Sequence, residues 1–160
     1  MLSAVQQSCM YDRILVPTDG SPSMQSVVDH ALELATVHDA TLYGLYVVDT
    51  GSFATLPVET TWDGVTEMLK EEGELAMEQF TELTGDEPVE TAIRDGNPSG
   101  EIVDYARTND CDAIVMGTHG RGGIDRLLLG SVAERVVRAA PVPVVTVPIS
   151  DGETEVEAPS

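Results

Sequence analysis

The stretch MGTHGRGGIDRLLLGS, which runs from Met116 to Ser131, decides the fold because it links an apolar segment to a helical one. Residues 112–116 before it are apolar and are predicted to form a buried strand. Residues 132–138 after it have the apolar spacing of a helix. Glycines let a bound group approach the backbone, and the first amides of a helix have no partner within the helix. The stretch is therefore predicted to form a phosphate-binding loop.

Two common phosphate-binding loops do not match this stretch. A P-loop needs a lysine followed by serine or threonine, and the only lysine of the chain is Lys70. The dinucleotide pattern GxGxxG is also missing from the sequence. The spacing is instead Gly117-x2-Gly120-x9-Gly130-Ser131, which puts three glycines and a hydroxyl between the predicted strand and the predicted helix.

Strand and helix patterns alternate along the chain. Strands are predicted over residues 11–17, 40–48, 89–94, 112–116 and 141–148, the last at a sheet edge because prolines flank it. Helices are predicted over residues 22–35, 63–83, 98–108 and 132–138. This alternation predicts an α/β fold, with a parallel sheet covered by helices on both faces. Ligands of such sheets bind beyond the carboxyl ends of the strands, where strand order reverses, so the loops at 18–20 and 117–131 are the candidates.

Capping residues predict where two helices begin. Ser21 is a good N-cap with Pro22 as the first helical residue, and Asn97 with Pro98 has the same pattern. In the helix predicted over residues 63–83, one apolar side is expected to face the sheet, made of Val65, Met68, Leu69, Ala76, Phe80 and Leu83. The glutamates of this helix are expected to form a solvated face.

Length and composition predict one soluble domain. We expect a single domain over residues 10–149, a flexible extension at 1–9, with Met10 as a candidate initiator, and a disordered acidic tail at 150–160. No apolar run is long enough to cross a membrane, and no secretory signal is expected. The two cysteines, Cys9 and Cys111, have no metal-type spacing and are expected to be reduced thiols in the cytoplasm, Cys111 as a small buried hydrophobe.

The net charge of −20 is the unusual feature of the composition. It argues against binding to nucleic acid or to anionic membranes, both of which need basic surfaces. A dense carboxylate surface is screened at high ionic strength, so the charge suggests adaptation to a cytoplasm rich in salt, as in a halophilic protein.

The signature Gly117-x2-Gly120-x9-Gly130-Ser131 resembles the nucleotide-binding signature of the universal stress protein family. Residues 16–21, 47–49 and 141–147 also resemble segments of that family, in the expected order, so the resemblance covers residues 10–148. It implies an open five-stranded parallel sheet of order 3-2-1-4-5, as in adenine nucleotide alpha hydrolase-like folds, and a homodimer formed through the last edge strand.

The resemblance also implies an ATP site, with Mg²⁺ accompanying the triphosphate. The residues it implies are Pro17, Thr18, Asp19, Val47, Met116, Gly117, Gly120, Arg121, Gly130, Ser131 and Val132. The glycines, the serine and Val132 would form the phosphate turn, with Arg121 facing the phosphates. The segment 17–19 would line the adenosine side, Val47 would meet adenine through its backbone, and Met116 would pack against the nucleoside.

Other interpretations stay open for several of these residues. Ser131-x-x-Glu134 is also a capping box, which stabilises a helix without any ligand. Asp19 is also a common turn residue. Arg121 is equally an ordinary solvated arginine. His119 has no predicted nucleophile beside it, so we assign it no catalysis.

Three functions are consistent with the sequence. The first is an ATP-binding stress-response or regulatory module. The second is a slow ATPase or an autophosphorylating enzyme, against which stands the lack of a general base or a lysine clamp. The third is a dimeric interaction protein whose glycine loop binds no nucleotide.

Overall fold

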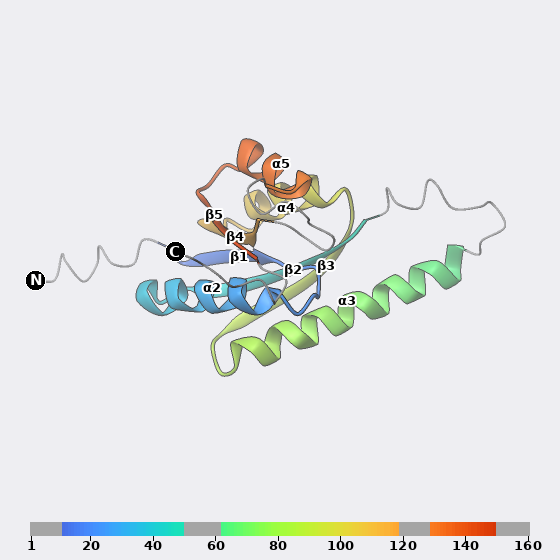
Figure 1. The fold of residues 1–160 in the computed structure, drawn as a ribbon, viewed down its shortest axis with the longest axis horizontal. Coiled ribbons are helices and arrows are strands. Elements are labelled where there is room, and N and C mark those ends of the chain that lie inside the picture. The colour runs from blue at the N-terminus through green and yellow to red at the C-terminus, as the bar shows by residue number, and fades with distance from the viewer. Residues whose placement is uncertain (1–10, 50–61, 119–128, 150–160) are drawn as a thin grey trace, which may run out of the picture.

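The structure is a computed structural model that describes residues 11–49, 62–118 and 129–149. Its centre is a parallel sheet of five strands in the order β3-β2-β1-β4-β5 (Figure 1). The strands are β1 Arg13–Pro17, β2 Thr41–Asp49, β3 Val89–Gly96, β4 Ala113–Gly117 and β5 Val144–Val147. The predicted α/β fold and strand order are confirmed, and β5 lies at an edge as predicted. The expected extension at 1–9 and tail at 150–160 lie outside the described residues.

Helices cover both faces of the sheet, as predicted (Figure 1). One face carries α2 and α3, and the other carries α4 and α5. The bounds are α2 Met24–His38, α3 Trp62–Thr84, α4 Pro98–Thr108 and α5 Ser131–Ala139. Within the described ranges, no helix is both long and apolar enough to span a bilayer.

The core consists of two layers, one on each side of the sheet. Ile14 and Val16 of β1 point to the layer under α2 and α3, whereas Leu15 points to the layer under α4 and α5. Successive side chains of a strand point to opposite faces, so a central strand buried on both faces has to be apolar at every position. This explains the continuous apolar run in β1.

The start of α4 confirms one prediction, and the start of α2 contradicts another. Asn97 caps α4, with its Oδ1 accepting a hydrogen bond from the Gly100 amide at 3.1 Å, and Pro98 is the first helical residue. The prediction that Ser21 caps α2 is wrong, because α2 begins at Met24. The Ser21 amide instead donates to Asp19 Oδ1 at 2.9 Å, which holds Ser21 in the preceding turn.

One residue of α3 is also wrongly placed by its sequence pattern. The apolar spacing predicts that Met68 faces the sheet, but Met68 is 64% exposed, as is Leu75 two turns later on the same side. Met77 is buried instead, and the side chain of Val65 lies outside what the structure describes. Met68 is about 100° around the helix from Leu69, which is enough to turn it from the core into solvent. The other expected contacts are confirmed, namely Leu69, Ala76, Phe80 and Leu83.

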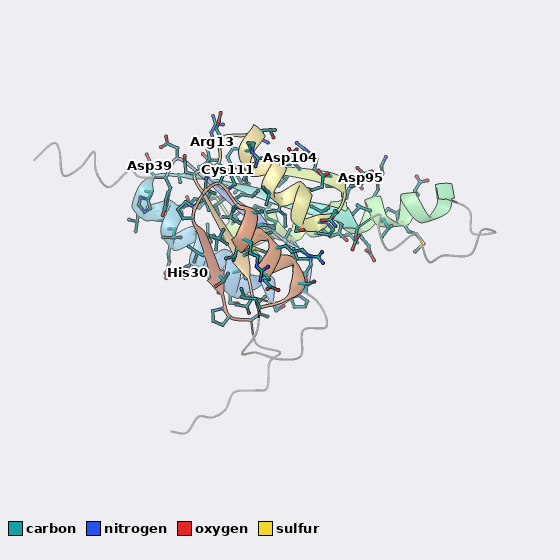
Figure 2. The ribbon with its side chains drawn as sticks, turned by 90° about the horizontal axis from the view of Figure 1, so that it is seen from above. Arg13, His30, Asp39, Asp95, Asp104 and Cys111 are labelled. Carbon is teal, nitrogen blue, oxygen red and sulfur yellow. The ribbon has the colours of Figure 1, made fainter. Side chains whose placement is uncertain are left out.

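Hydrogen bonds connect the amino ends of β1 and β4, at the end of the sheet opposite the candidate loops. Asp112 Oδ2 accepts hydrogen bonds from the amides of Asp12 at 2.8 Å and Arg13 at 3.0 Å. Cys111 lies beside Arg13 at this end of the sheet (Figure 2) and is 3% exposed, so the predicted buried thiol is confirmed. Burial raises the pKa of the Cys111 thiol to about 11. The hydrogen bonds to Asp112 hold β1 and β4 together at this end of the sheet, opposite the candidate loops.

Candidate functional site

The strand order reverses between β1 and β4. β1 pairs with β2 on one side, where Pro17 lies opposite Leu45, and with β4 on the other, where Leu15 lies opposite Ile114. The chain leaves β1 toward one half of the sheet and leaves β4 toward the other half. The loops that follow the two strands therefore part at their carboxyl ends, which is where ligands bind in doubly wound sheets.

The turn after β1 is held by three hydrogen bonds. The Thr18 amide donates to the Leu45 carbonyl at 2.9 Å and so extends the ladder by one residue. Thr18 Oγ1 accepts from the Gly20 amide at 3.0 Å, and Asp19 Oδ1 accepts from the Ser21 amide at 2.9 Å. Gly20 has a φ of 78°, which favours glycine. The turn role of Asp19 is therefore confirmed, and a role toward a ligand stays a prediction.

The two ends of the glycine-rich loop meet beyond β4. Gly117 lies opposite Val147 of β5, and the Thr118 amide donates to the Val147 carbonyl at 3.0 Å. The Gly130 amide then donates to the Thr118 carbonyl at 2.6 Å. This bond places the start of α5 directly beyond the end of β4. Gly120 and Arg121, which the sequence assigned to this site, lie outside the described residues.

The first turn of α5 has no side-chain cap. Its N-cap is Gly130, at φ −67° and ψ 167°, and glycine has no side chain with which to bond the following amides. The predicted capping box at Ser131 is wrong, because Ser131 is already the first helical residue. The reason is tertiary, since the bond from Gly130 to Thr118 sets where the helix begins. In contrast, Asn97 caps α4 with its side chain.

Val47 and Met116 lie near the same end of the sheet, in or against the apolar layer under α4 and α5. The Leu42 amide donates to the Pro88 carbonyl, so the backbone groups of Leu42 face β3. Backbone groups alternate sides along a strand, and those of Leu45 and Val47 therefore face β1. The ladder to β1 ends where Thr18 meets Leu45, so the N–H and C=O of Val47 point into the space just beyond the end of β1.

The sequence-predicted residues thus separate into three groups. Pro17 ends β1, and Thr18 and Asp19 follow it at one lip. At the other lip Gly117 ends β4, and Gly130 precedes Ser131 and Val132, the first residues of α5. Val47 and Met116 lie at the carboxyl ends of the adjoining strands. In the portions that the structure describes, no group of three or more acidic, histidine or cysteine residues is arranged to hold a metal ion.

The sequence does not predict three backbone carbonyl groups that hold the two candidate loops in place. The carbonyls of Leu45, Thr118 and Val147 accept the hydrogen bonds that close the two loops. They act through the main chain, which every residue type possesses, so no side-chain pattern in the sequence marks them. A fourth contact comes from α3, where Gln79 Nε2 donates to the Ser21 carbonyl at 3.3 Å.

A parallel sheet of order 3-2-1-4-5, with two glycine-containing loops at its switch point, defines a doubly wound α/β protein. The chain belongs to the universal stress protein family, whose sequence profile matches residues 10–148. Universal stress protein MJ0531 of Methanocaldococcus jannaschii is 42% identical over 140 residues, with 86% of this chain and 82% of that protein covered.

Solved structures of related proteins have the same fold. The structure of MJ0577, another universal stress protein of Methanocaldococcus jannaschii, superposes with a TM-score of 0.76 at 32% identity, covering 86% of this chain and 96% of that one. A universal stress protein in complex with cAMP gives a TM-score of 0.57 at 27% identity, with 87% of this chain and 98% of that chain covered. The complex of the Archaeoglobus fulgidus protein with dAMP gives 0.59 at 25% identity, with 88% and 99% covered. Some structural neighbours of this chain therefore hold adenine nucleotides.

Proposed function

We propose that this protein binds ATP between the carboxyl ends of β1 and β4 and acts as a nucleotide-dependent regulatory module of the stress response. The observation that carries the proposal is the bond from the Gly130 amide to the Thr118 carbonyl. It sets a helix start without a side-chain cap at the switch point of the sheet, where the first amides of the helix would bind an anion. Relatives that hold cAMP and dAMP support an adenine nucleotide as the ligand class.

The phosphate side of the proposed site is built from glycines and helix amides. Gly117 and Gly130 flank the loop, and the amides of Ser131 and Val132 open α5. Gly120 and Arg121 belong to the same proposed site through the family signature. ATP with bound Mg²⁺ would bring the negative charge that this donor set stabilises.

The adenosine side of the proposed site uses backbone groups and an apolar wall. The N–H and C=O of Val47 face the space beyond β1 and suit the polar edge of adenine. Met116 supplies the apolar wall, with Pro17, Thr18 and Asp19 on the opposite lip. The donors, the acceptors and the wall together fit a nucleotide.

We also propose a homodimer, with a second copy meeting β5. In the part of the chain that the structure describes, β5 pairs with β4 on one side only. Its four residues are all half-buried, and an unpaired edge of this kind is a site for pairing with another chain. The proposed unit is one domain over residues 10–149, acting in the cytoplasm.

Calorimetry with Mg²⁺-ATP in molar potassium chloride tests the binding site. We expect one ATP per chain, and an affinity at least about tenfold weaker in Gly130→Ala, equivalent to about 1.4 kcal/mol. The backbone of Gly130 has a φ of −67°, which alanine adopts without strain, so the loss reports the methyl group at the phosphate turn. Displacement of ATP by AMP, cAMP and dAMP would rank the related nucleotides.

Gly100→Ala is the matched control, because it also lies in the first turn of a helix. A Cβ at Gly100 would meet Asn97 Oδ1 at 3.6 Å, an ordinary contact, and that amide is already capped. We expect its ATP affinity to equal that of the wild type. A folded wild-type protein that releases no heat with ATP, or equal affinities in Gly130→Ala and wild type, would refute the proposed site.

A further inference from the structure

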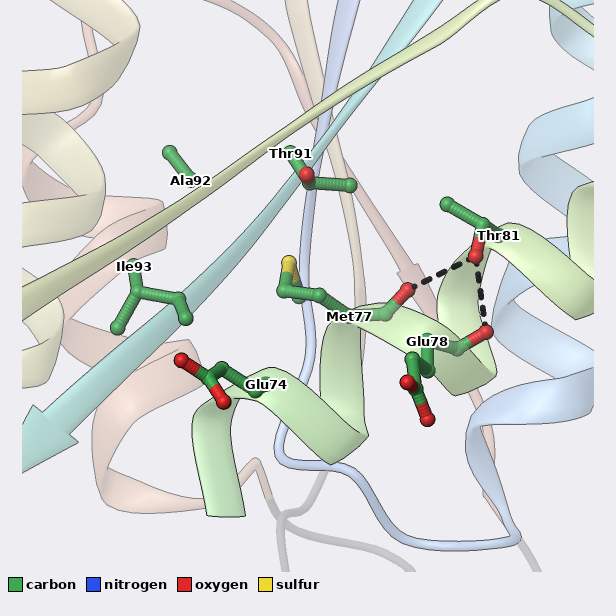
Figure 3. Close-up of a pocket in the computed structure, with 7 residues that line it drawn as sticks. All are labelled: Glu74, Met77, Glu78, Thr81, Thr91, Ala92 and Ile93. Carbon is green, nitrogen blue, oxygen red and sulfur yellow. Dashed lines mark hydrogen bonds between the residues drawn. The ribbon is translucent and has the colours of Figure 1, made fainter. Parts of the chain in front are cut away.

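A second concave surface lies at the far edge of the sheet, on β3 (Figure 3). It is a groove of about 530 Å³ between α3 and β3. Glu74 and Glu78 of α3 form one wall, and Thr91 and Ile93 of β3 form the other. Met77, which is 8% exposed, lines the groove from α3 together with the 37% exposed Ile93. Two strands separate β3 from β4, so this groove is distinct from the proposed nucleotide site.

The groove runs beside an open strand edge. Among the described residues β3 pairs only with β2, over all eight of its positions. Because the Leu42 amide donates to the Pro88 carbonyl, the even-numbered residues of β3 face β2. The backbone groups of Val89, Thr91, Ile93 and Asp95 therefore point away from the sheet. This row of donors and acceptors can pair with one more strand.

The charges around the groove favour a different protein over a second copy of this chain as the added strand. Glu74 and Glu78 are both exposed along it, and a second copy of the same edge would bring carboxylates against carboxylates. Arg94 of β3 already lies 3.7 Å from Glu101 and 4.9 Å from the ring of Tyr105, on the side of the sheet that carries α4. Lys70 lies one helical turn before Glu74 and is not among the residues that line the groove, so the charged residues of the lining are both acidic. The excess of negative charge calls for a basic partner.

The spacing of the two acidic wall residues matches that of a strand. Glu74 and Glu78 are one helical turn apart, about 6 Å. Side chains at i and i+2 of a strand are about 6.6 Å apart on one face. Two basic side chains on the same face of an added strand would therefore each meet one glutamate. The aliphatic stems of these basic side chains would contact Ile93 and Met77 at the groove floor.

We propose that β3 and this groove bind an extended segment of another protein, in which lysine or arginine alternates with β-branched residues and which joins the sheet as a sixth strand. Main-chain hydrogen bonds to the outward groups of Thr91 and Ile93 would supply affinity. The basic side chains at alternate positions would supply selectivity. This binding does not depend on the proposed nucleotide site.

A capped peptide of eight residues, the length of β3, tests the proposal. The probe alternates lysine with valine, and the control probe has glutamate in place of lysine. We expect the lysine peptide to shift the NMR amide signals of β3 and of the α3 residues that line the groove, and to bind more weakly in molar potassium chloride than in dilute buffer. Wild-type protein that binds neither peptide, or binds both equally, would overturn the proposal.

Paired charge variants separate the groove from general attraction to an acidic protein. Glu74→Gln with Glu78→Gln should weaken the lysine peptide about tenfold in dilute buffer. Glu71→Gln with Glu82→Gln removes the same charge from exposed positions of α3 outside the groove lining and should change affinity less than about twofold. Equal weakening by both pairs would show non-specific attraction and would refute the groove.

A proline variant tests the added strand itself. Thr91→Pro removes an outward amide and no bond to β2, and edge strands accept proline. We expect a folded protein that no longer binds the lysine peptide. If the variant unfolds, a probe N-methylated at alternate residues makes the same test on the wild type. Full binding by that N-methylated probe in both possible registers would exclude strand addition.

Discussion

Gly44 of β2 lies directly against the ring of Phe80 of α3. A Cβ at position 44 would come within 2.6 Å of Phe80 Cδ2 and Cε2 and 3.0 Å of Cγ. Phe80 is 1% exposed and packed on all sides, so its ring has no free space into which to move. Gly44→Ala therefore overpacks the layer between α3 and the sheet.

The expected cost follows from two opposing effects. Overpacking a well-filled core costs about 1 to 3 kcal/mol, whereas replacing glycine by alanine in a strand contributes roughly 0.5 to 1 kcal/mol in the other direction. We expect a net loss of about 1 to 2 kcal/mol in the free energy of unfolding. For a chain of this size the loss lowers Tm by roughly 2 to 8 °C. Urea unfolding followed by circular dichroism, in molar potassium chloride, measures the free energy of unfolding, and thermal unfolding in the same buffer measures Tm.

A double-mutant cycle assigns the loss to this contact. Phe80→Leu removes the ring edge that Gly44→Ala would meet, so the double variant should be more stable than the sum of the single effects by about 1 kcal/mol. Gly100→Ala, whose new Cβ meets nothing closer than 3.6 Å, should cost nothing measurable. Additive effects of Gly44→Ala and Phe80→Leu would show that the argument from the ring contact is wrong.

Three further outcomes are expected. Asn97→Ala should lower the free energy of unfolding by about 1 kcal/mol, because two donors lose their acceptor. These donors are the Gly100 amide at 3.1 Å and the Ser99 hydroxyl at 2.9 Å from Asn97 Oδ1. Asn97→Asp retains the acceptor and should stay close to wild type in urea unfolding. Burial raises the pKa of Cys111 from 9.0 to about 11, so the folded state holds this proton more tightly than the unfolded state. The contribution of this shift to the free energy of unfolding is complete below pH 9 and falls by about 2 to 3 kcal/mol as pH rises through 11. The free energies of unfolding of wild type and Cys111→Ala should therefore differ by an amount that changes with pH, and a constant difference over this range would contradict the argument. With a net charge of −20, the protein should also gain Tm from dilute buffer to molar potassium chloride, and a Tm indifferent to salt would argue against adaptation to a salt-rich cytoplasm.

Local sequence determined the elements and their order. The apolar run through Ile14, Leu15 and Val16 predicts a strand buried on both faces, and Asn97-Pro98 predicts the start of α4, because both signals act over a few residues. The sheet of order 3-2-1-4-5 and the family also followed from the sequence, since the glycine spacing and the segments that resemble the family occur in the expected order.

The tertiary structure decided which groups meet. Ser131 carries a capping-box pattern, but the bond between Gly130 and Thr118 starts the helix one residue earlier than that pattern requires. Met68 has an apolar side chain at a suitable spacing, yet the direction of α3 leaves it in solvent. The sequence pattern predicts that Glu74 and Glu78 lie on a solvated helix face. Only the packing of α3 beside β3 makes these two residues one wall of a groove. Sequence patterns report the periodicity of one segment, whereas these features depend on the distance between two segments.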